Sequence, residues 1–80
     1  MFKDLEELVK IIRERKNATE EKSYTKTLLN NKKLSLEKVK EEIQELIESV
    51  ENNSNKIHES ADVIYHLLVY MEANQIKIED

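Results

Sequence analysis

Residues 55–73 read N-K-I-H-E-S-A-D-V-I-Y-H-L-L-V-Y-M-E-A, and their helical periodicity decides the fold. The apolar residues form two faces, made of Ile57, Ala61, Ile64, Tyr65, Leu68 and Met71, and of Val63, Leu67 and Tyr70, with Val69 between them. The polar strip left in the centre is Glu59, Asp62 and His66. A helix that is apolar nearly all round is normally buried on several sides. Because 80 residues supply too few other helices to cover it, the stretch predicts a homo-oligomer, most simply a two-fold homodimer with this helix central.

A second acidic cluster, Glu41-Glu42-Ile43-Gln44-Glu45, lies in the preceding stretch, which predicts a helix from Leu36 to Glu51. The apolar stripe of this helix is made of Leu36, Val39, Ile43, Leu46, Ile47 and Val50. At about 100° per residue, Glu42 lies at the edge of the stripe. Progressively further from the apolar stripe, around the helix, lie Glu45, Lys38 and Glu41. The polar residues 52–55 predict a turn that folds the two helices back on each other.

This folding would bring the carboxylates of Glu42, Glu45, Glu59 and Asp62 together. Like charges at such short distances repel one another, and they are rarely buried without a partner of opposite charge. A solvated helix face is the ordinary explanation for any single glutamate, but it does not explain acids on the polar strip of an otherwise apolar helix. A hard divalent cation with oxygen ligands, Mg²⁺ or Mn²⁺, would remove the repulsion. The four residues are therefore predicted as metal ligands.

The N-terminal third of the chain predicts two further helices. Residues from Phe2 to about Arg15 carry an amphipathic stripe of Phe2, Leu5, Leu8, Val9 and Ile12. Residues 16–22 break this rhythm and predict a loop. A short helix is expected over residues 23–29, capped by a hydroxyl near its start.

The remaining segments complete a single domain over residues 1–80, all-α and built of four to five helices. Residues 30–33 are predicted to form a turn, and Ser35 is predicted as the N-cap of the third helix. Residues 74–80 are interpreted as a helix exit followed by a short docked or frayed end.

The composition agrees with a small helical protein and excludes several classes. Gly, Pro and Cys are absent, which removes the usual hairpin turns, disulfides and thiolate metal sites. The formal net charge of -4 argues against a general nucleic-acid binder, which would carry a basic face. No apolar run approaches the ~20 residues of a membrane span, and the N-terminus lacks a signal-peptide core. We expect a cytoplasmic protein that binds neither nucleic acid nor membrane.

Taken together, these residues resemble the phosphoribosyl-ATP pyrophosphohydrolase family, of the all-α nucleoside-triphosphate pyrophosphatase (MazG-like) superfamily. The superfamily pattern is EExxE followed by ExxD, matched here by Glu41, Glu42, Glu45, Glu59 and Asp62. Three longer stretches are similar to the family as well: residues 13–16 with 23–25, residues 38–42 and residues 59–69. The resemblance covers nearly the whole chain and implies an intertwined homodimer with a helix-bundle core.

The chain departs from the family pattern in a few places. Lys40 replaces the usual glycine before the paired glutamates, and residues 30–36 also lack a usual glycine. Gln75 stands where the fourth helix commonly ends at glycine. Much of the family's C-terminal segment is missing. These departures bear on loop geometry and substrate preference more than on metal binding.

The resemblance implies hydrolysis of phosphoribosyl-ATP, the small-molecule nucleotide substrate, to phosphoribosyl-AMP and pyrophosphate, the second step of histidine biosynthesis. A Mg²⁺ cofactor, with Mn²⁺ as the alternative, would screen the triphosphate and polarise its phosphoryl oxygens. Glu41 is expected to orient or deprotonate the attacking water, or else to support the metal ligands from behind. The expected phosphate contacts are Arg15, Lys16 and Lys38. The other expected substrate contacts are Ser23, Tyr24, Thr25 and His66.

Several alternatives stay open at this point. His66 is either a hydrogen-bonding residue of the ligand pocket or a satisfied, semi-buried histidine. Tyr24 belongs either to the core or to the substrate site, and His58 is expected at the surface. The chain is alternatively a MazG-like house-cleaning enzyme acting on non-standard nucleoside triphosphates, or a non-catalytic helical interaction module whose acidic strip pairs with a basic partner.

Overall fold

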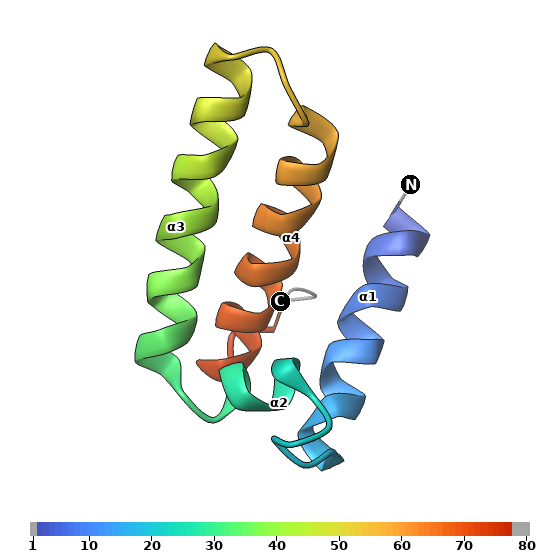
Figure 1. Cartoon of the computed structure of the whole chain (residues 1–80). Coiled ribbons are helices and arrows are strands. Elements are labelled where there is room, and N and C mark those ends of the chain that lie inside the picture. Colours follow the sequence, from blue (N-terminus) through green and yellow to red (C-terminus); the bar gives the residue numbers. More distant parts are fainter. Residues whose placement is uncertain (1, 78–80) are drawn as a thin grey trace.

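The computed structural model describes residues 2–77, and within that range the chain forms four α-helices, one short 3₁₀-helix and no strand. The helices are α1 (Phe2–Glu14), η1 (Arg15–Asn17), α2 (Tyr24–Leu29), α3 (Lys32–Glu51) and α4 (Lys56–Ala73). Figure 1 shows α3 and α4 side by side as an antiparallel hairpin, with α1 on the other side of α4. The short α2 crosses the end of the hairpin opposite the turn between α3 and α4. The predicted all-α class is confirmed.

The apolar core lies where α1 and α2 pack against the C-terminal half of α4. Its buried side chains are Val9 and Ile12 of α1, Leu28 of α2, and Leu68 and Val69 of α4. The stripe predicted for the first helix is thus the face that packs on α4, although the side chain of Phe2 lies outside the described residues. This core fixes α4, and α4 in turn carries the polar strip.

Local hydrogen bonds explain where α2 and α3 begin. Ser23 caps α2 as predicted, because its Oγ accepts the backbone N–H of Lys26 at 3.2 Å. The prediction that Ser35 caps α3 is wrong. Asn31 is the N-cap, with Oδ1 accepting the N–H of Leu34 at 3.0 Å, so α3 begins at Lys32. Asn is as strong an N-cap as Ser, and the earlier start places Ser35 inside the helix, where its side chain is buried.

The loop predicted over residues 16–22 is only partly correct, because Arg15–Asn17 form a 3₁₀ turn. This turn and the end of α1 are held to α4 by Glu72. Arg13 Nε lies 3.3 Å from Glu72 Oε2, and Lys16 Nζ lies 2.6 Å from Oε1. Burial pushes the pKa of Glu72 upward, but the hydrogen bonds from Lys16 and Arg13 outweigh it and hold the pKa below its ordinary value. The ion pairs therefore anchor the N-terminal helix to the hairpin.

The single chain leaves much apolar surface of the hairpin uncovered. On α3, Ile43, Ile47 and Val50 are exposed, and on α4 so are Ile64, Leu67 and above all Ile57, at 89%. The sequence predicted that α4 is buried on several sides, and within one chain this holds only for its C-terminal half. The homodimer stays a prediction. No helix among residues 2–77 has the length and apolarity needed to cross a membrane. Of the predicted tail, residues 78–80 lie outside the described residues.

Candidate active site

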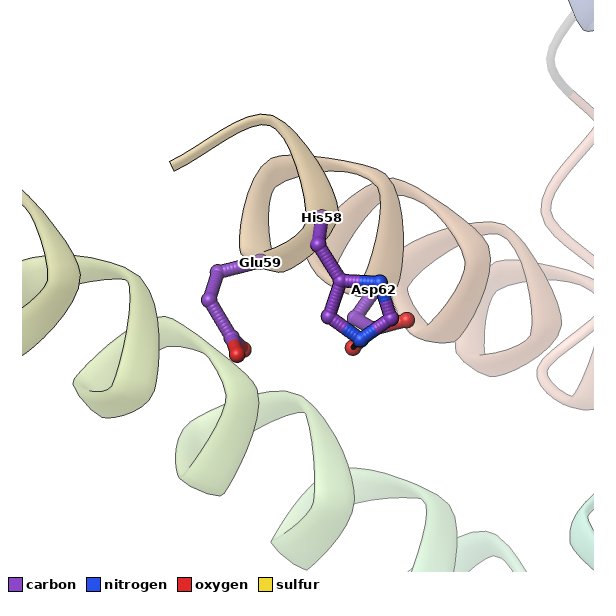
Figure 2. A group of neighbouring side chains, drawn as sticks. All are labelled: His58, Glu59 and Asp62. Carbon is purple, nitrogen blue, oxygen red and sulfur yellow. Dashed lines mark ion pairs between the residues drawn. The ribbon is translucent and has the colours of Figure 1, made fainter. Parts of the chain in front are cut away.

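The hairpin brings the predicted carboxylates together between α3 and α4. Glu42 and Glu45 come from α3 and Glu59 from α4, and one carboxylate oxygen of each lies within 4.8 Å of the others. A second group, formed by His58, Glu59 and Asp62, meets the same 4.8 Å limit. Figure 2 shows this second group on the N-terminal part of α4, with the Glu59 carboxylate directed toward α3. Because Glu59 belongs to both groups, we call the five residues together the acidic cluster.

The position of His58 in this cluster was missed in the sequence, where it was expected at the surface. Its side chain is indeed 73% exposed, but its Nε2 lies 3.3 Å from Asp62 Oδ2. The i, i+4 spacing of the two residues on α4 was the signal that could have revealed the contact.

The carboxylates of the cluster repel one another. Burial raises the pKa of Glu42 to about 7, and contact with Glu45 and the negative charges of Asp62 and Glu59 add to the rise. Burial and the charges of Glu45 and Asp62 also raise the pKa of Glu59. In addition, the Oε2 atoms of Glu42 and Glu59 are buried without a hydrogen-bond partner among the described residues. Such a site is unfavourable for the protein alone.

A divalent cation fits this set of residues. Mg²⁺ and Mn²⁺ prefer carboxylate oxygens, and Glu42, Glu45, Glu59 and Asp62 offer them from two rigid helices. The two buried, unpartnered oxygens are atoms that such a cation would satisfy. The imidazole of His58 is a ligand better suited to transition metals than to Mg²⁺.

Lys38, Glu41 and Tyr24 lie beside the acidic cluster. Lys38 Nζ is 3.2 Å from Glu41 Oε2, and Lys38 lies one turn of α3 before Glu42, as Glu41 does before Glu45. The Glu41 side chain is about half exposed, in contrast to that of Glu42 at 14%. Tyr24, at the start of α2, is also half exposed, and its ring stands edge-on to that of His66 with centroids 6.1 Å apart. The cluster is therefore flanked by one cation, one more accessible carboxylate and one open aromatic ring.

His66 is buried behind the cluster. Its Nε2 lies 3.9 Å from Glu42 Oε1, and its ring is also edge-on to Tyr65 with centroids 5.0 Å apart. Burial lowers the pKa of His66 below its ordinary value, so the neutral imidazole is favoured. Its Nδ1 is buried without a partner among residues 2–77.

The other predicted substrate contacts lie elsewhere or make structural bonds. Ser23 is buried as the cap of α2, and Thr25 Oγ1 is hydrogen-bonded to Tyr65 Oη. Arg15 is exposed in η1, and Lys16 is paired with Glu72. Lys16 also lines a cavity of about 280 Å³ with Lys26, which follows Tyr24 by two residues and so lies on the opposite face of α2. The structure thus brings Tyr24, Lys38 and His66 to the cluster, but it brings neither Lys16 nor Ser23 there.

Fold and site together define an all-α protein with a carboxylate cluster between two antiparallel helices. Residues 5–80 match the family model described as "Phosphoribosyl-ATP pyrophosphohydrolase". The chain belongs to this family.

Named relatives agree with this assignment. The chain is 38% identical to a phosphoribosyl-ATP pyrophosphatase of Haloarcula marismortui, over 95% of this chain and 83% of that protein. It is 43% identical to one of Methanosarcina acetivorans, over 88% of this chain and 72% of that protein. It is also 38% identical to part of a histidine biosynthesis trifunctional protein of Kluyveromyces lactis, over 91% of this chain and 9% of that protein. No solved structure gives a significant match.

Proposed function

We propose that the chain is a cytoplasmic hydrolase that converts phosphoribosyl-ATP to phosphoribosyl-AMP and pyrophosphate, the second step of histidine biosynthesis, with Mg²⁺ as its cofactor. The observation that carries the proposal is the acidic cluster, in a chain that belongs to the phosphoribosyl-ATP pyrophosphohydrolase family. A triphosphate brings several negative charges of its own. A site whose carboxylates already repel one another accepts it only together with a cation.

Glu42, Glu45, Glu59 and Asp62 are the residues that would hold the cation. When bound, Mg²⁺ or Mn²⁺ supplies charge neutralisation and polarises the phosphoryl oxygens. The two rigid helices position the four carboxylates in advance, which limits the reorganisation needed on substrate binding.

Glu41 and Lys38 supply the groups for proton and phosphate handling. Lys38 holds Glu41 Oε2 at 3.2 Å, which leaves Oε1 to orient the attacking water and accept its proton. The Lys38 ammonium is also placed to contact a phosphate beside the cluster. Tyr24, half exposed at the same edge, offers its ring face to the ribose or the base.

The proposal includes a homodimer. Its support is the exposed apolar surface of α3 and α4, because side chains such as Ile47, Val50 and Ile57 would leave water on association. The hairpin that carries these side chains also carries the acidic cluster. Dimer formation would therefore stiffen the elements that hold the metal ligands.

Pyrophosphate release from phosphoribosyl-ATP, measured beside a panel of nucleoside triphosphates, tests the proposed activity. We expect phosphoribosyl-ATP to be the preferred substrate, and the reaction to require Mg²⁺ or Mn²⁺. A preference for a non-standard nucleoside triphosphate would instead support the house-cleaning enzyme.

A double variant, Glu45→Gln with Asp62→Asn, tests the metal ligands by calorimetry with Mg²⁺ and Mn²⁺ and by activity. We expect both binding and activity to be lost. The matched control is Glu48→Gln, which removes an exposed carboxylate of α3 that is not part of the cluster. If the wild type binds neither metal, with or without nucleotide, the chain is a helical interaction module instead.

A further inference from the structure

His66 occupies a place that neither the family match nor the metal chemistry explains. It is the one polar residue among the buried residues of α4, with a side chain only 9% exposed. The edge-on rings of Tyr24 and Tyr65 enclose its imidazole at 6.1 and 5.0 Å between centroids. An ordinary buried histidine has both ring nitrogens satisfied. Here Nδ1 has no partner among the described residues, and Nε2 faces only a carboxylate.

That carboxylate is Glu42, and its two oxygens have different surroundings. Oε1 lies 3.9 Å from His66 Nε2, whereas Oε2 is buried without a partner. A separation of 3.9 Å is longer than a hydrogen bond, so the two groups are neighbours without a formed hydrogen bond. One oxygen of Glu42 is thus beside a ring nitrogen of His66, and the other remains for a cation.

We propose that His66 is a positioning residue, whose Nε2–H holds Oε1 of Glu42 so that Oε2 is presented to the divalent cation. This inference rests on the proposed function, since it assigns a role to a residue behind the same metal site. In this role His66 acts through Glu42 and not on the substrate directly. The rings of Tyr24 and Tyr65 keep the imidazole from turning away, and the Tyr65 hydroxyl is fixed in turn by Thr25.

The arrangement has a general physical basis. Residues that hydrogen-bond metal ligands from behind fix the orientation of the ligand, and their loss typically lowers metal affinity roughly 10- to 100-fold. A neutral imidazole carries its proton on the nitrogen that meets an acceptor. We therefore expect the Nε2–H tautomer of His66.

The experiment measures the affinity of the chain for Mn²⁺ in the absence of substrate. Electron paramagnetic resonance reports the concentration of the unbound ion, and all measurements are made at one fixed pH. Three variants are compared with the wild type: His66→Gln, His66→Asn and His66→Leu. Glutamine carries its amide nitrogen at about the position of Nε2, whereas asparagine carries it near Nδ1 and leucine has none. We expect His66→Gln to bind Mn²⁺ within about 3-fold of the wild type. We expect His66→Asn and His66→Leu to bind roughly 10- to 100-fold more weakly.

The Gln and Asn pair keeps the test valid if the leucine variant fails to fold, because both are amides of similar polarity. Equal Mn²⁺ affinity of all folded variants and the wild type would overturn the inference and leave the proposed function standing. Equal weakening in His66→Gln and His66→Asn would also overturn it. A wild type that binds no Mn²⁺ would instead overturn the proposed function, and this inference with it. Nitrogen NMR of the wild-type imidazole is a second check, and an Nδ1–H tautomer would contradict the assignment.

Discussion

At the scale of single residues, Glu42 makes the stability of the metal-free chain dependent on pH. Its pKa is about 7 in the folded chain, against 4.5 for an ordinary glutamate. Between these values the folded state binds more protons than the unfolded state, so stability falls as pH rises through this window. At about 1.4 kcal/mol per pKa unit the penalty is ~3.5 kcal/mol at most. Screening by solvent reduces it to about 1–2 kcal/mol.

Glu42→Gln removes this penalty. In the absence of divalent ions we expect the variant to be more stable than the wild type by about 1–2 kcal/mol above pH ~7, and equally stable below pH ~4.5. Urea unfolding at the two pH values measures the difference. Added Mg²⁺ is expected to stabilise the wild type more than the variant. Glu48→Gln is the control and should show no such pH dependence; a constant difference between Glu42→Gln and the wild type would contradict the argument.

Ser35 is a second residue whose burial has a cost. It is fully buried in the first turn of α3, and its Oγ has no partner among residues 2–77. An unsatisfied buried hydroxyl is unfavourable by about 1–3 kcal/mol, and alanine is the better helix former. We therefore expect Ser35→Ala to raise the free energy of unfolding by about 1 kcal/mol, as measured by urea titration. Ser49→Ala is the matched control, because Ser49 Oγ donates to the carbonyl of Leu46 at 2.7 Å, and this change should not stabilise the chain.

At the scale of elements, the sequence predicted which segments are helical better than where each helix begins. The extents of α1 and α4 were predictable from periodicity, and the cap of α2 was predictable from the hydroxyl at its start. The start of α3 was not, because Asn31 and Ser35 are both good N-caps and only packing against the core distinguishes them. The four carboxylates followed from helical spacing and the turn at residues 52–55. The depth of His66 did not, because it depends on how α2 lies across the hairpin.

The C-terminus of α4 ends in a backbone geometry that its sequence does not favour. Gln75 has φ 57°, in the left-handed region. The N–H groups of Gln75 and Ile76 donate to the carbonyls of Glu72 and Met71 at 3.2 and 2.9 Å, the Schellman pattern, which usually places glycine at this position. A residue with a Cβ loses about 1–2 kcal/mol there.

Gln75→Gly is therefore expected to stabilise the chain, because it relieves this strain. Glycine also gains freedom in the unfolded chain, worth about 0.4–1 kcal/mol, so the net gain is about 0.5–1 kcal/mol. For a domain of this size the thermal midpoint should rise by roughly 3–6 °C. Asn52→Gly is the matched control, because Asn52 ends α3 with φ -90° and bears no such strain. It should lower the midpoint; a fall in both variants would refute the explanation.

At the scale of the whole molecule, the sequence pattern of α4 predicts apolar burial on more sides than one chain provides. The structure shows which part of the apolar surface is left exposed. Its buried core lies at the α1 and α2 end, while the uncovered apolar side chains of the hairpin spread along α3 and along α4 from Ile57 to Leu67. Periodicity alone did not separate these two halves, because the same apolar face of α4 holds buried Leu68 and exposed Ile57. What divides them is the length and position of α1, a matter of tertiary packing.

Ile64 offers a sharp test of the homodimer. It is 46% exposed, and at two residues from Asp62 it lies on the opposite side of α4 from the acidic strip. A glutamate there would disturb an interface without adding charge to the metal site. Stable interfaces bury about 800 Å² per partner, and an unpaired charge at their centre is strongly unfavourable. In sedimentation experiments we expect a dimeric wild type and a monomeric Ile64→Glu.

Ile11→Glu is the matched control for this change. Ile11 is 44% exposed, almost the same as Ile64, but it lies on α1, outside the uncovered surface of the hairpin. The two variants share the substitution, the helical setting and the change of net charge, so only the position differs. If α3 and α4 form the interface, Ile11→Glu stays dimeric, and the thermal midpoint rises with protein concentration for it and for the wild type but not for Ile64→Glu. Dimers of equal stability in both variants would place the interface elsewhere, and a monomeric wild type would show that the hairpin surface is exposed in solution.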